Sequence, residues 1–230
     1  MITIAIVNSK GGVGKTTLAA SMAIEATREQ VGRDKRSARV ALVDLDPQRS
    51  LAKWWQGRTG GDQSSNPMLL DNVDDACDAV ERLEYLGVEY AIFDSPPAFL
   101  GTIETCITCT DFIVIPLRAS MLDVAASEDA ITMARAAGAQ TLLVLNDVHA
   151  SEGIVTATHD WLCEQEGIAL AKTMIHHRVA HTYAMIAGRT GAETVNNKID
   201  RAAATELAAL WVEIRDRAHK AAAAKREAAE

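Results

Sequence analysis

Two lysines and three glycines lie close together near the start of the chain, in the stretch Ser9–Thr17, which reads SKGGVGKTT. An apolar run, Ile2–Val7, precedes this stretch, and a helix-compatible run, Leu18–Ala26, follows it. Glycines allow backbone conformations that a Cβ resists, so successive N–H groups can point inward at an anion. The positive end of the following helix adds to that attraction. The stretch therefore predicts a phosphate-binding loop between a strand and a helix.

The side chains of this loop suit a nucleotide triphosphate. In a P-loop, Lys15 places a cation on the β- and γ-phosphates, and the Thr16 hydroxyl ligates Mg²⁺. The usual pattern G-x-x-x-x-G-K-[ST] fails at its first position, where Ser9 stands, and Lys10 is an additional lysine at the start of the loop. We expect ATP and Mg²⁺ as cofactors. The residues expected to hold the nucleotide are Gly11, Gly12, Val13, Gly14, Lys15, Thr16 and Thr17.

Carboxylates follow two later apolar runs, each of which is typical of a buried parallel strand. Val40–Val43 is followed by Asp44, and Tyr90–Phe93 is followed by Asp94. The carboxyl ends of such strands lie at the sheet edge where α/β proteins bind ligands. We therefore expect Asp94 to hold Mg²⁺ through water, opposite the Thr16 hydroxyl.

Three motifs together resemble a known family. Lys10–Thr17 is similar to the deviant Walker A motif of the ParA/MinD family of P-loop ATPases. Asp44–Trp54 (D-x-D-P-Q-x-S-L-x-x-W) resembles the switch I region of partition ATPases, and Asp94–Pro97 (D-S-P-P) resembles their switch II. The likeness covers residues 1 to about 215 and is closest to the small, ParF-like ParA proteins.

The resemblance assigns roles to individual residues. It implies that Asp46 positions the attacking water, although a helix N-terminal cap is an alternative. Lys10, Lys15 and Asp46 are thus the candidate catalytic residues. Asn146, which follows the apolar run Thr141–Leu145, resembles the position whose side chain meets the adenine edge, and a structural cap is its alternative. The expected switch residues are Asp44, Pro47, Gln48, Pro96 and Pro97.

The additional lysine determines the mechanism that the resemblance implies. In the family, the residue matching Lys10 crosses to the nucleotide of a partner subunit, so that ATP joins two protomers in a homodimer. Arg118–Ala125 resembles a P-S-x-L-D-x-x-A segment that contributes to the dimer interface, although Ala119 replaces the proline. An ordinary loop is the alternative for this segment.

The implied function is partition of a plasmid or chromosome by a slow ATPase. Its ATP-bound dimer would bind DNA without sequence preference, and a ParB-like partner would stimulate hydrolysis. One alternative is a positioning ATPase of the same class with a protein cargo, such as a carboxysome or a chemoreceptor cluster. Another is an amide-ligase enzyme of the dethiobiotin synthetase type.

Apolar strands that alternate with helices predict an α/β fold, a doubly wound and mostly parallel sheet with helices on both faces. We expect residues 1–230 to form a single P-loop domain that ends in a helix over about 202–230. Leu207, Leu210, Trp211 and Ile214 supply its apolar docking stripe. Earlier helices are expected at 71–87, 124–137 and 154–166, and a strand at 169–175.

The net charge of −8 gives no general attraction to nucleic acid, but basic residues gather locally. The basic residues near the C-terminus are nearly balanced by acidic ones, so a solvated face is the alternative interpretation of that set. The candidate DNA contacts are Arg28, Arg33, Lys35, Arg36 and Arg39, or Arg201, Arg215, Arg217 and Lys220.

The apolar runs are all shorter than the roughly 20 residues of a membrane span, so we expect no membrane association. With the first strand at the N-terminus and no signal peptide, the expected location is cytoplasmic, and nucleoid-associated when ATP is bound.

Cysteines and histidines leave alternatives open. All four cysteines are expected to be reduced thiols. Cys106 and Cys109 suggest core packing first and a redox or iron–sulfur site second. His176, His177 and His181 cluster, but a metal site there would need a further ligand.

Overall fold

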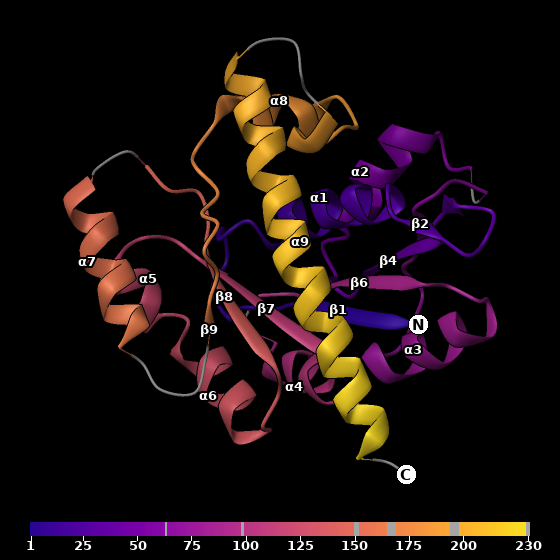
Figure 1. The fold of residues 1–230 in the computed structure, drawn as a ribbon, viewed down its shortest axis with the longest axis horizontal. Helices are drawn as coiled ribbons and strands as arrows, with labels where there is room; N and C mark the ends of the chain where they lie inside the picture. The colour runs from indigo at the N-terminus through magenta and orange to yellow at the C-terminus, as the bar shows by residue number, and fades with distance from the viewer. Residues whose placement is uncertain (63, 98, 150–151, 165–168, 194–197, 229–230) are drawn as a thin grey trace.

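A parallel β-sheet forms the centre of the molecule (Figure 1). The computed structural model describes residues 1–230 apart from 63, 98, 150–151, 165–168, 194–197 and 229–230. Within the described residues the strand order is β5-β4-β6-β1-β7-β8-β9, and each neighbouring pair is parallel. The bounds are β1 (Ile2–Ile6), β4 (Val40–Asp44), β5 (Met68–Leu70), β6 (Tyr90–Asp94), β7 (Phe112–Leu117), β8 (Thr141–Leu145) and β9 (Ala169–Leu170). The predicted fold class is confirmed.

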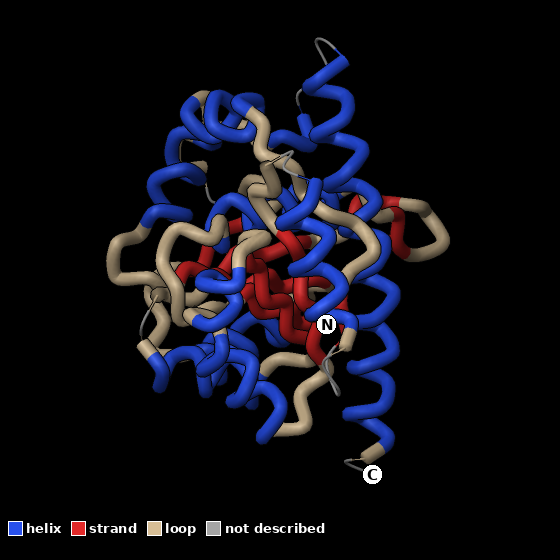
Figure 2. Tube along the Cα trace, turned by 90° about the vertical axis from the view of Figure 1, so that its left-hand side faces the viewer, coloured by secondary structure: helices blue, strands red, loops and turns tan. Residues whose placement is uncertain are grey.

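Helices cover both faces of the sheet, so the strands lie in the middle layer (Figure 2). Side chains alternate along each strand, and both sets are buried. In β1, for example, Ile4 and Ile6 enter one apolar core, whereas Ala5 enters the other. The first core contains α1 (Lys15–Thr27), α2 (Ser50–Thr59) and α9 (Lys198–Glu227). The second contains α3 (Ala76–Tyr85), α4 (Leu100–Cys109), α5 (Met121–Ala125), α6 (Glu128–Ala136) and α7 (Glu152–Cys163).

The long helix α9 runs across the first face of the sheet (Figure 1). It begins at Lys198, four residues before the predicted start, and all four residues of its predicted docking stripe are buried. The Trp211 indole N–H donates to Glu29 Oε1 at 2.8 Å, and Arg215 donates to the same oxygen at 2.8 Å. Among the described residues, no helix is both long enough and apolar enough to cross a membrane.

The helix expected over 71–87 is shorter, α3, because the Asp75 carboxylate caps its start by accepting from the N–H groups of Cys77 and Asp78. The helix expected over 154–166 is α7, and the last two predicted residues lie outside the described ones.

Two further elements also differ in their extent. The helix expected over 124–137 is two helices, α5 and α6. Between them the Ser127 N–H donates to the Val124 carbonyl at 2.9 Å, and the Ser127 hydroxyl donates to the Asp123 carbonyl at 2.8 Å. The strand expected over 169–175 ends at Leu170. Beyond it, the N–H groups of Lys172 and Thr173 donate to the Glu213 carboxylate of α9 at 3.0 and 2.9 Å, which draws them away from β8.

The cysteines also differ from the prediction. Cys77 of α3 and Cys109 of α4 form a disulfide, with their Cα atoms 5.3 Å apart, so these two are not free thiols. They are 32 residues apart in the sequence, and no local spacing indicates that the two helices pack together. Cys106 is a free, buried thiol, as expected for core packing, and Cys163 is free and exposed.

The position of α9 generates a stability prediction. Trp211 is 3% exposed, whereas its neighbour Val212 is 44% exposed. We expect Trp211→Ala to lower the free energy of unfolding by about 3–5 kcal/mol, because it opens a cavity and leaves Glu29 without its indole donor. Val212→Ala, the matched control, should change it by less than about 0.5 kcal/mol. Urea unfolding followed by circular dichroism measures both, and equal losses would show that α9 is not docked through this face.

Candidate functional site

The glycine-rich loop between β1 and α1 has the backbone shape that phosphate binding requires. Gly12 and Gly14 have φ angles of 76° and 88°, in the left-handed region that favours glycine. A Cβ on Gly14 would also lie 2.4 Å from Nδ2 of Asn146, so a side chain has no room there. Since α1 begins at Lys15, the loop ends at the positive end of a helix. The predicted order of strand, loop and helix is confirmed.

Lys15 is buried at the base of this loop, where its Nζ donates to the Lys10 carbonyl at 2.9 Å. Burial lowers the pKa of Lys15, while the carboxylates of Asp94 and Asp46 raise it. The Lys15 ammonium group is therefore held inside the loop, near the carboxylates of Asp94 at the end of β6 and Asp46 just beyond β4.

Asp94 and Thr16 meet at the place predicted for Mg²⁺. The Thr16 hydroxyl donates to Asp94 Oδ2 at 2.7 Å. Asp94 is 0% exposed, and burial raises its pKa to about 7, with Asp44 acting in the same direction and Thr16 and Lys15 against it. Among the described residues, Asp94 Oδ1 and Ser95 Oγ are buried without a hydrogen-bond partner. Carboxylate and hydroxyl oxygens are the hard ligands that Mg²⁺ takes, so these residues fit the ion.

The switch I carboxylates differ in their environment. Asp44 is buried and accepts from the N–H groups of Ala52 and Asp46 at 2.9 and 3.1 Å, and burial raises its pKa. Asp46 is half-buried, and its Oδ1 accepts from the Gln48 N–H at 2.8 Å. The N-cap of α2 is Arg49, with φ 53°, so the alternative role of Asp46 as that cap is wrong. Pro47 and Gln48 are exposed.

Asn146 contacts the loop itself. Its Nδ2 donates to the Val13 carbonyl at 2.8 Å, which fixes the side chain beside Gly14. It also lines a cavity of about 340 Å³ together with Gly12, Thr17 and other residues. Contact with adenine stays a prediction, while the structural role is present. In switch II, Pro96 is buried. Pro97 lies beside the loop, because a Cβ added to Gly11 would be 3.9 Å from the Cβ of Pro97.

The additional lysine has a partner within its own chain. Lys10 Nζ forms an ion pair with Asp123 of α5. The Lys10 N–H donates to Asn8 Oδ1 at 2.8 Å, and Asn8 Nδ2 donates to the Pro116 carbonyl and to Ser127 Oγ, both at 2.8 Å. Sequence reasoning missed Asn8, although a polar residue directly after an apolar strand is a signal that could have identified it.

The predicted histidine cluster does not converge. His176 Nδ1 lies 3.0 Å from Glu206 of α9, and His177 Nδ1 lies 2.6 Å from Asp147. His181 is on α8 (Val179–Ile186), where burial lowers its pKa. All three residues line the same cavity as Asn146, but His176 and His177 have different partners, and among the described residues the buried Nε2 of His181 has none.

A lysine-bearing glycine loop at the end of β1, with a buried carboxylate beside its threonine at the end of β6, defines a P-loop nucleotide-binding protein of the doubly wound α/β class. The chain belongs to the CobQ/CobB/MinD/ParA nucleotide binding domain family, whose model matches residues 4–226. The resemblance to the ParA/MinD family is thereby confirmed.

Named relatives include two kinds of protein. The chain is 29% identical over 198 residues to maintenance of carboxysome distribution protein A of Halothiobacillus neapolitanus, covering 81% of this chain and 84% of the relative. It is 28% identical over 125 residues to protein ParA of Rhizobium radiobacter, covering 54% of this chain and 51% of the relative.

Solved structures confirm the fold. A putative plasmid partition protein of Borrelia burgdorferi bound to AMPPNP is similar with a TM-score of 0.69 and 16% identity, covering 93% of this chain and 99% of that one. MinD in the MinC:MinD cell division complex of Aquifex aeolicus is similar with a TM-score of 0.70 and 16% identity, covering 93% and 96%. At this level of identity, the likeness concerns the fold alone.

The buried carboxylate predicts a pH dependence. Because the pKa of Asp94 is raised in the folded protein, this residue destabilises the nucleotide-free fold increasingly as the pH rises from about 4 to 7. Asp94→Asn should therefore be more stable than the wild type by roughly 2–4 kcal/mol at pH 8, and by less at pH 5.

Urea unfolding at both pH values measures this difference. Asp34→Asn, at an exposed turn, is the control and should show no such widening. A pH-independent difference for Asp94→Asn would contradict the raised pKa.

Proposed function

We propose that this protein is an ATP-switched positioning ATPase that dimerises around ATP and distributes a protein assembly, of the carboxysome kind, over DNA. The nucleotide switch is supported by the presence of two lysines in different settings, Lys15 inside the loop and Lys10 at its mouth. The kind of cargo is supported by the carboxysome-distribution relative, which aligns with most of both chains.

Lys10 is the residue that makes dimerisation depend on ATP. Lys10 is paired with Asp123 of the same chain, and its side chain is partly exposed. A phosphate of a second subunit can therefore replace Asp123 as the anion that Lys10 contacts. A charge-assisted contact of this kind contributes roughly 1.5–3 kcal/mol, and a symmetric dimer contains two of them. Loss of the γ-phosphate on hydrolysis removes the contact and releases the subunits.

The hydrolysis of ATP to ADP and phosphate uses residues on three strand ends. Lys15 binds the phosphates, and Asp46, half-buried beyond β4, orients the attacking water. Thr16, and Asp94 through water, would hold Mg²⁺, which would neutralise charge that develops on the phosphates. The attacking water has only Asp46 as its proposed orienting group, which agrees with slow turnover until a partner protein completes the site.

The DNA contacts are assigned to the hairpin formed by β2 (Gln30–Val31) and β3 (Arg36–Ser37). Arg33 and Lys35 are exposed at its turn, and among the described residues neither has an ion pair. Other candidates are already paired, Arg28 with Glu25 and Arg36 with Glu89.

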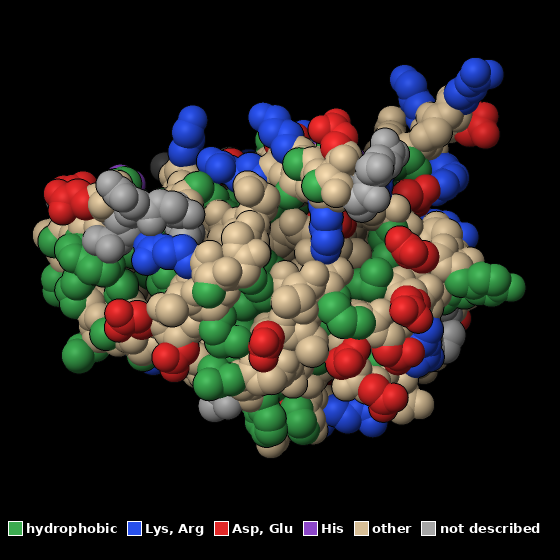
Figure 3. All heavy atoms as spheres, turned by 90° about the horizontal axis from the view of Figure 1, so that it is seen from below, with side chains coloured by type: hydrophobic (Ala, Val, Ile, Leu, Met, Phe, Trp, Pro, Cys, Tyr) green, Lys and Arg blue, Asp and Glu red, His purple; other side chains and the backbone are tan. Residues whose placement is uncertain are grey.

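In the C-terminal set, Arg215 is paired with Glu29 and Asp216. On the face seen from below, uncharged polar side chains and backbone predominate, with hydrophobic and acidic side chains scattered among them, and Lys and Arg side chains are most numerous along the upper edge (Figure 3).

Plasmid partition with a ParB-like partner is the second candidate, because the ParA relative matches about half of the chain. The two candidates differ in cargo and share the switch. Loss of the gene would cluster a protein assembly in the first case and cause plasmid loss in the second. Turnover stimulated by neither DNA nor a partner protein, but by a small carboxylic acid, would favour the amide-ligase alternative over both.

Substitution of the two lysines should affect two different properties, ATP affinity and dimerisation. Lys15→Ala should lose ATP affinity by tenfold or more, since one charge-assisted contact is worth roughly 1.5–3 kcal/mol. Lys10→Ala should still bind ATP but stay monomeric. Titration with a fluorescent ATP analogue and light scattering in ATP measure the two properties. An ATP-dependent dimer of Lys10→Ala would disprove the role of Lys10 across the interface.

DNA binding by the ATP-bound protein should weaken steeply with salt, because phosphate contacts release counterions. Arg33→Ala and Lys35→Ala should each lower the slope of log affinity against log salt by about 1. Arg36→Ala on the same hairpin is the matched control and should change it less, since Glu89 already holds that guanidinium. A salt response unchanged in both variants would exclude the hairpin as the DNA contact.

A further inference from the structure

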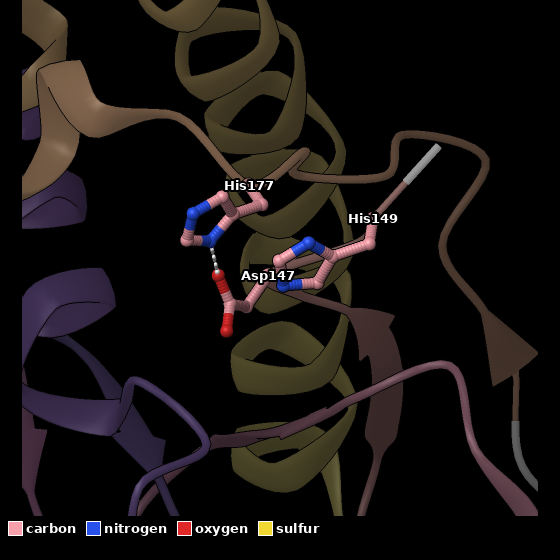
Figure 4. Close-up of side chains that lie close together, drawn as sticks. All are labelled: Asp147, His149 and His177. Carbon is pink, nitrogen blue, oxygen red and sulfur yellow. Dashed lines mark hydrogen bonds and ion pairs between the residues drawn. The ribbon is translucent and has the colours of Figure 1, made fainter. Parts of the chain in front are cut away.

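The cavity of about 340 Å³ beside the glycine loop is called the nucleotide cavity below. At its rim, three side chains gather around one point, those of Asp147, His149 and His177 (Figure 4). A carboxylate oxygen and one nitrogen from each imidazole all lie within 4.8 Å of one another. The sequence indicated His177 as part of a histidine cluster, but its neighbours here come from a segment about 30 residues earlier.

The backbone fixes this arrangement. Val148 and His176 form an isolated parallel bridge, in which the Val148 N–H donates to the Ile175 carbonyl at 3.0 Å and the His177 N–H donates to the Val148 carbonyl at 2.8 Å. Asp147 has a φ of 57°, so the chain bends there, and the side chains of Asp147 and His149 both contact that of His177 (Figure 4). The three positions are therefore set by main-chain pairing.

The side chains are already in contact. His177 Nδ1 lies 2.6 Å from Asp147 Oδ1, and the rings of His149 and His177 stack with centroids 4.2 Å apart and planes inclined by 19°. On its other oxygen, Asp147 Oδ2 lies 2.9 Å from Arg118 Nη2. Arg118 thus orients the carboxylate and leaves Oδ1 directed toward the histidines.

We propose that Asp147, His149 and His177 bind a divalent transition metal of the Zn²⁺ class. Two imidazole nitrogens and one carboxylate oxygen form a donor set typical of Zn²⁺, with water as a fourth ligand. Ligand atoms around tetrahedral zinc are about 3.4 Å apart, so rotation of the exposed His149 ring closes the site with the backbone unmoved. The metal takes the place of the proton between His177 and Asp147.

This site is distinct from the proposed magnesium position at Thr16 and Asp94. Mg²⁺ prefers oxygen ligands, whereas two of the three donors here are nitrogens. Asp147, His177 and Arg118 line the nucleotide cavity, while His149 faces a smaller cavity of about 220 Å³. His149 can therefore be changed without altering a residue of the nucleotide cavity.

The test is calorimetric titration of the nucleotide-free full chain with Zn²⁺, and with Mg²⁺ for comparison. A Cys163→Ser background removes the exposed thiol whose Sγ lies 3.8 Å from His159 Nδ1 and which could bind zinc independently. We expect one Zn²⁺ per chain and no comparable Mg²⁺ binding here. His149→Ala and Asp147→Asn should each weaken zinc binding by about tenfold or more. His176→Ala, the matched control, should bind zinc as the parent does, because its ring faces Glu206.

A thermal melt of each variant, with and without Zn²⁺, distinguishes a loss of folding from a loss of zinc binding. Zinc should raise the Tm of the parent and of His176→Ala, and not that of His149→Ala. Should His149→Ala not fold, Asp147→Asn gives the same comparison. No zinc binding by the parent, zinc binding unchanged in both site variants, or an equal loss in His176→Ala would overturn the proposal. ATP binding by His149→Ala should persist, so this result is independent of the proposed ATPase function.

Discussion

The buried carboxylate of Asp94 is the constraint on which the site depends. The parallel register places Asp94 beside Ile6 of β1 and Asp44 of β4, so the end of β6 lies directly next to the glycine loop. A charge in this position costs several kcal/mol unless a cation compensates it. Lys15 supplies part of that compensation, and the Thr16 hydroxyl, which donates to the same carboxylate, supplies another part. In the proposed function, Mg²⁺ would compensate the remaining charge when nucleotide binds.

The two lysines of the loop are held by different interactions, and the proposed function gives them different roles. Lys15 is buried and bonded to a carbonyl of its own loop, so the proposed function assigns it to the phosphates of its own subunit. Lys10 is only half-buried, and the carboxylate that holds it belongs to α5 rather than to the loop. The network around Asn8 connects the two regions, since its side chain contacts the Lys10 N–H and Ser127. A change at the loop mouth can thus reach α5 and α6.

The sequence predicts those parts of the site that depend on neighbours along the chain. The glycine loop, its flanking strand and helix, and Asp94 at a strand end are local patterns, and their placement agrees with the structure. Contacts between distant segments leave no such pattern. The pairing of Lys10 with Asp123, the disulfide of Cys77, and the approach of His149 to His177 each depend on how elements pack. The helix interrupted near 127 and the strand that stops at 170 both lie beside bonds between side chains and the main chain, involving Ser127 and Glu213, which periodicity does not encode.

The account depends most on where Lys10 lies once ATP is bound. A crystal structure with Mg²⁺ and a non-hydrolysable ATP analogue locates it directly. We predict two chains face to face, with each Lys10 Nζ within hydrogen-bonding distance of a phosphate bound to the partner and no longer paired with Asp123. A nucleotide-filled single chain that keeps the Lys10–Asp123 pair would contradict the switch and leave only a nucleotide-binding protein.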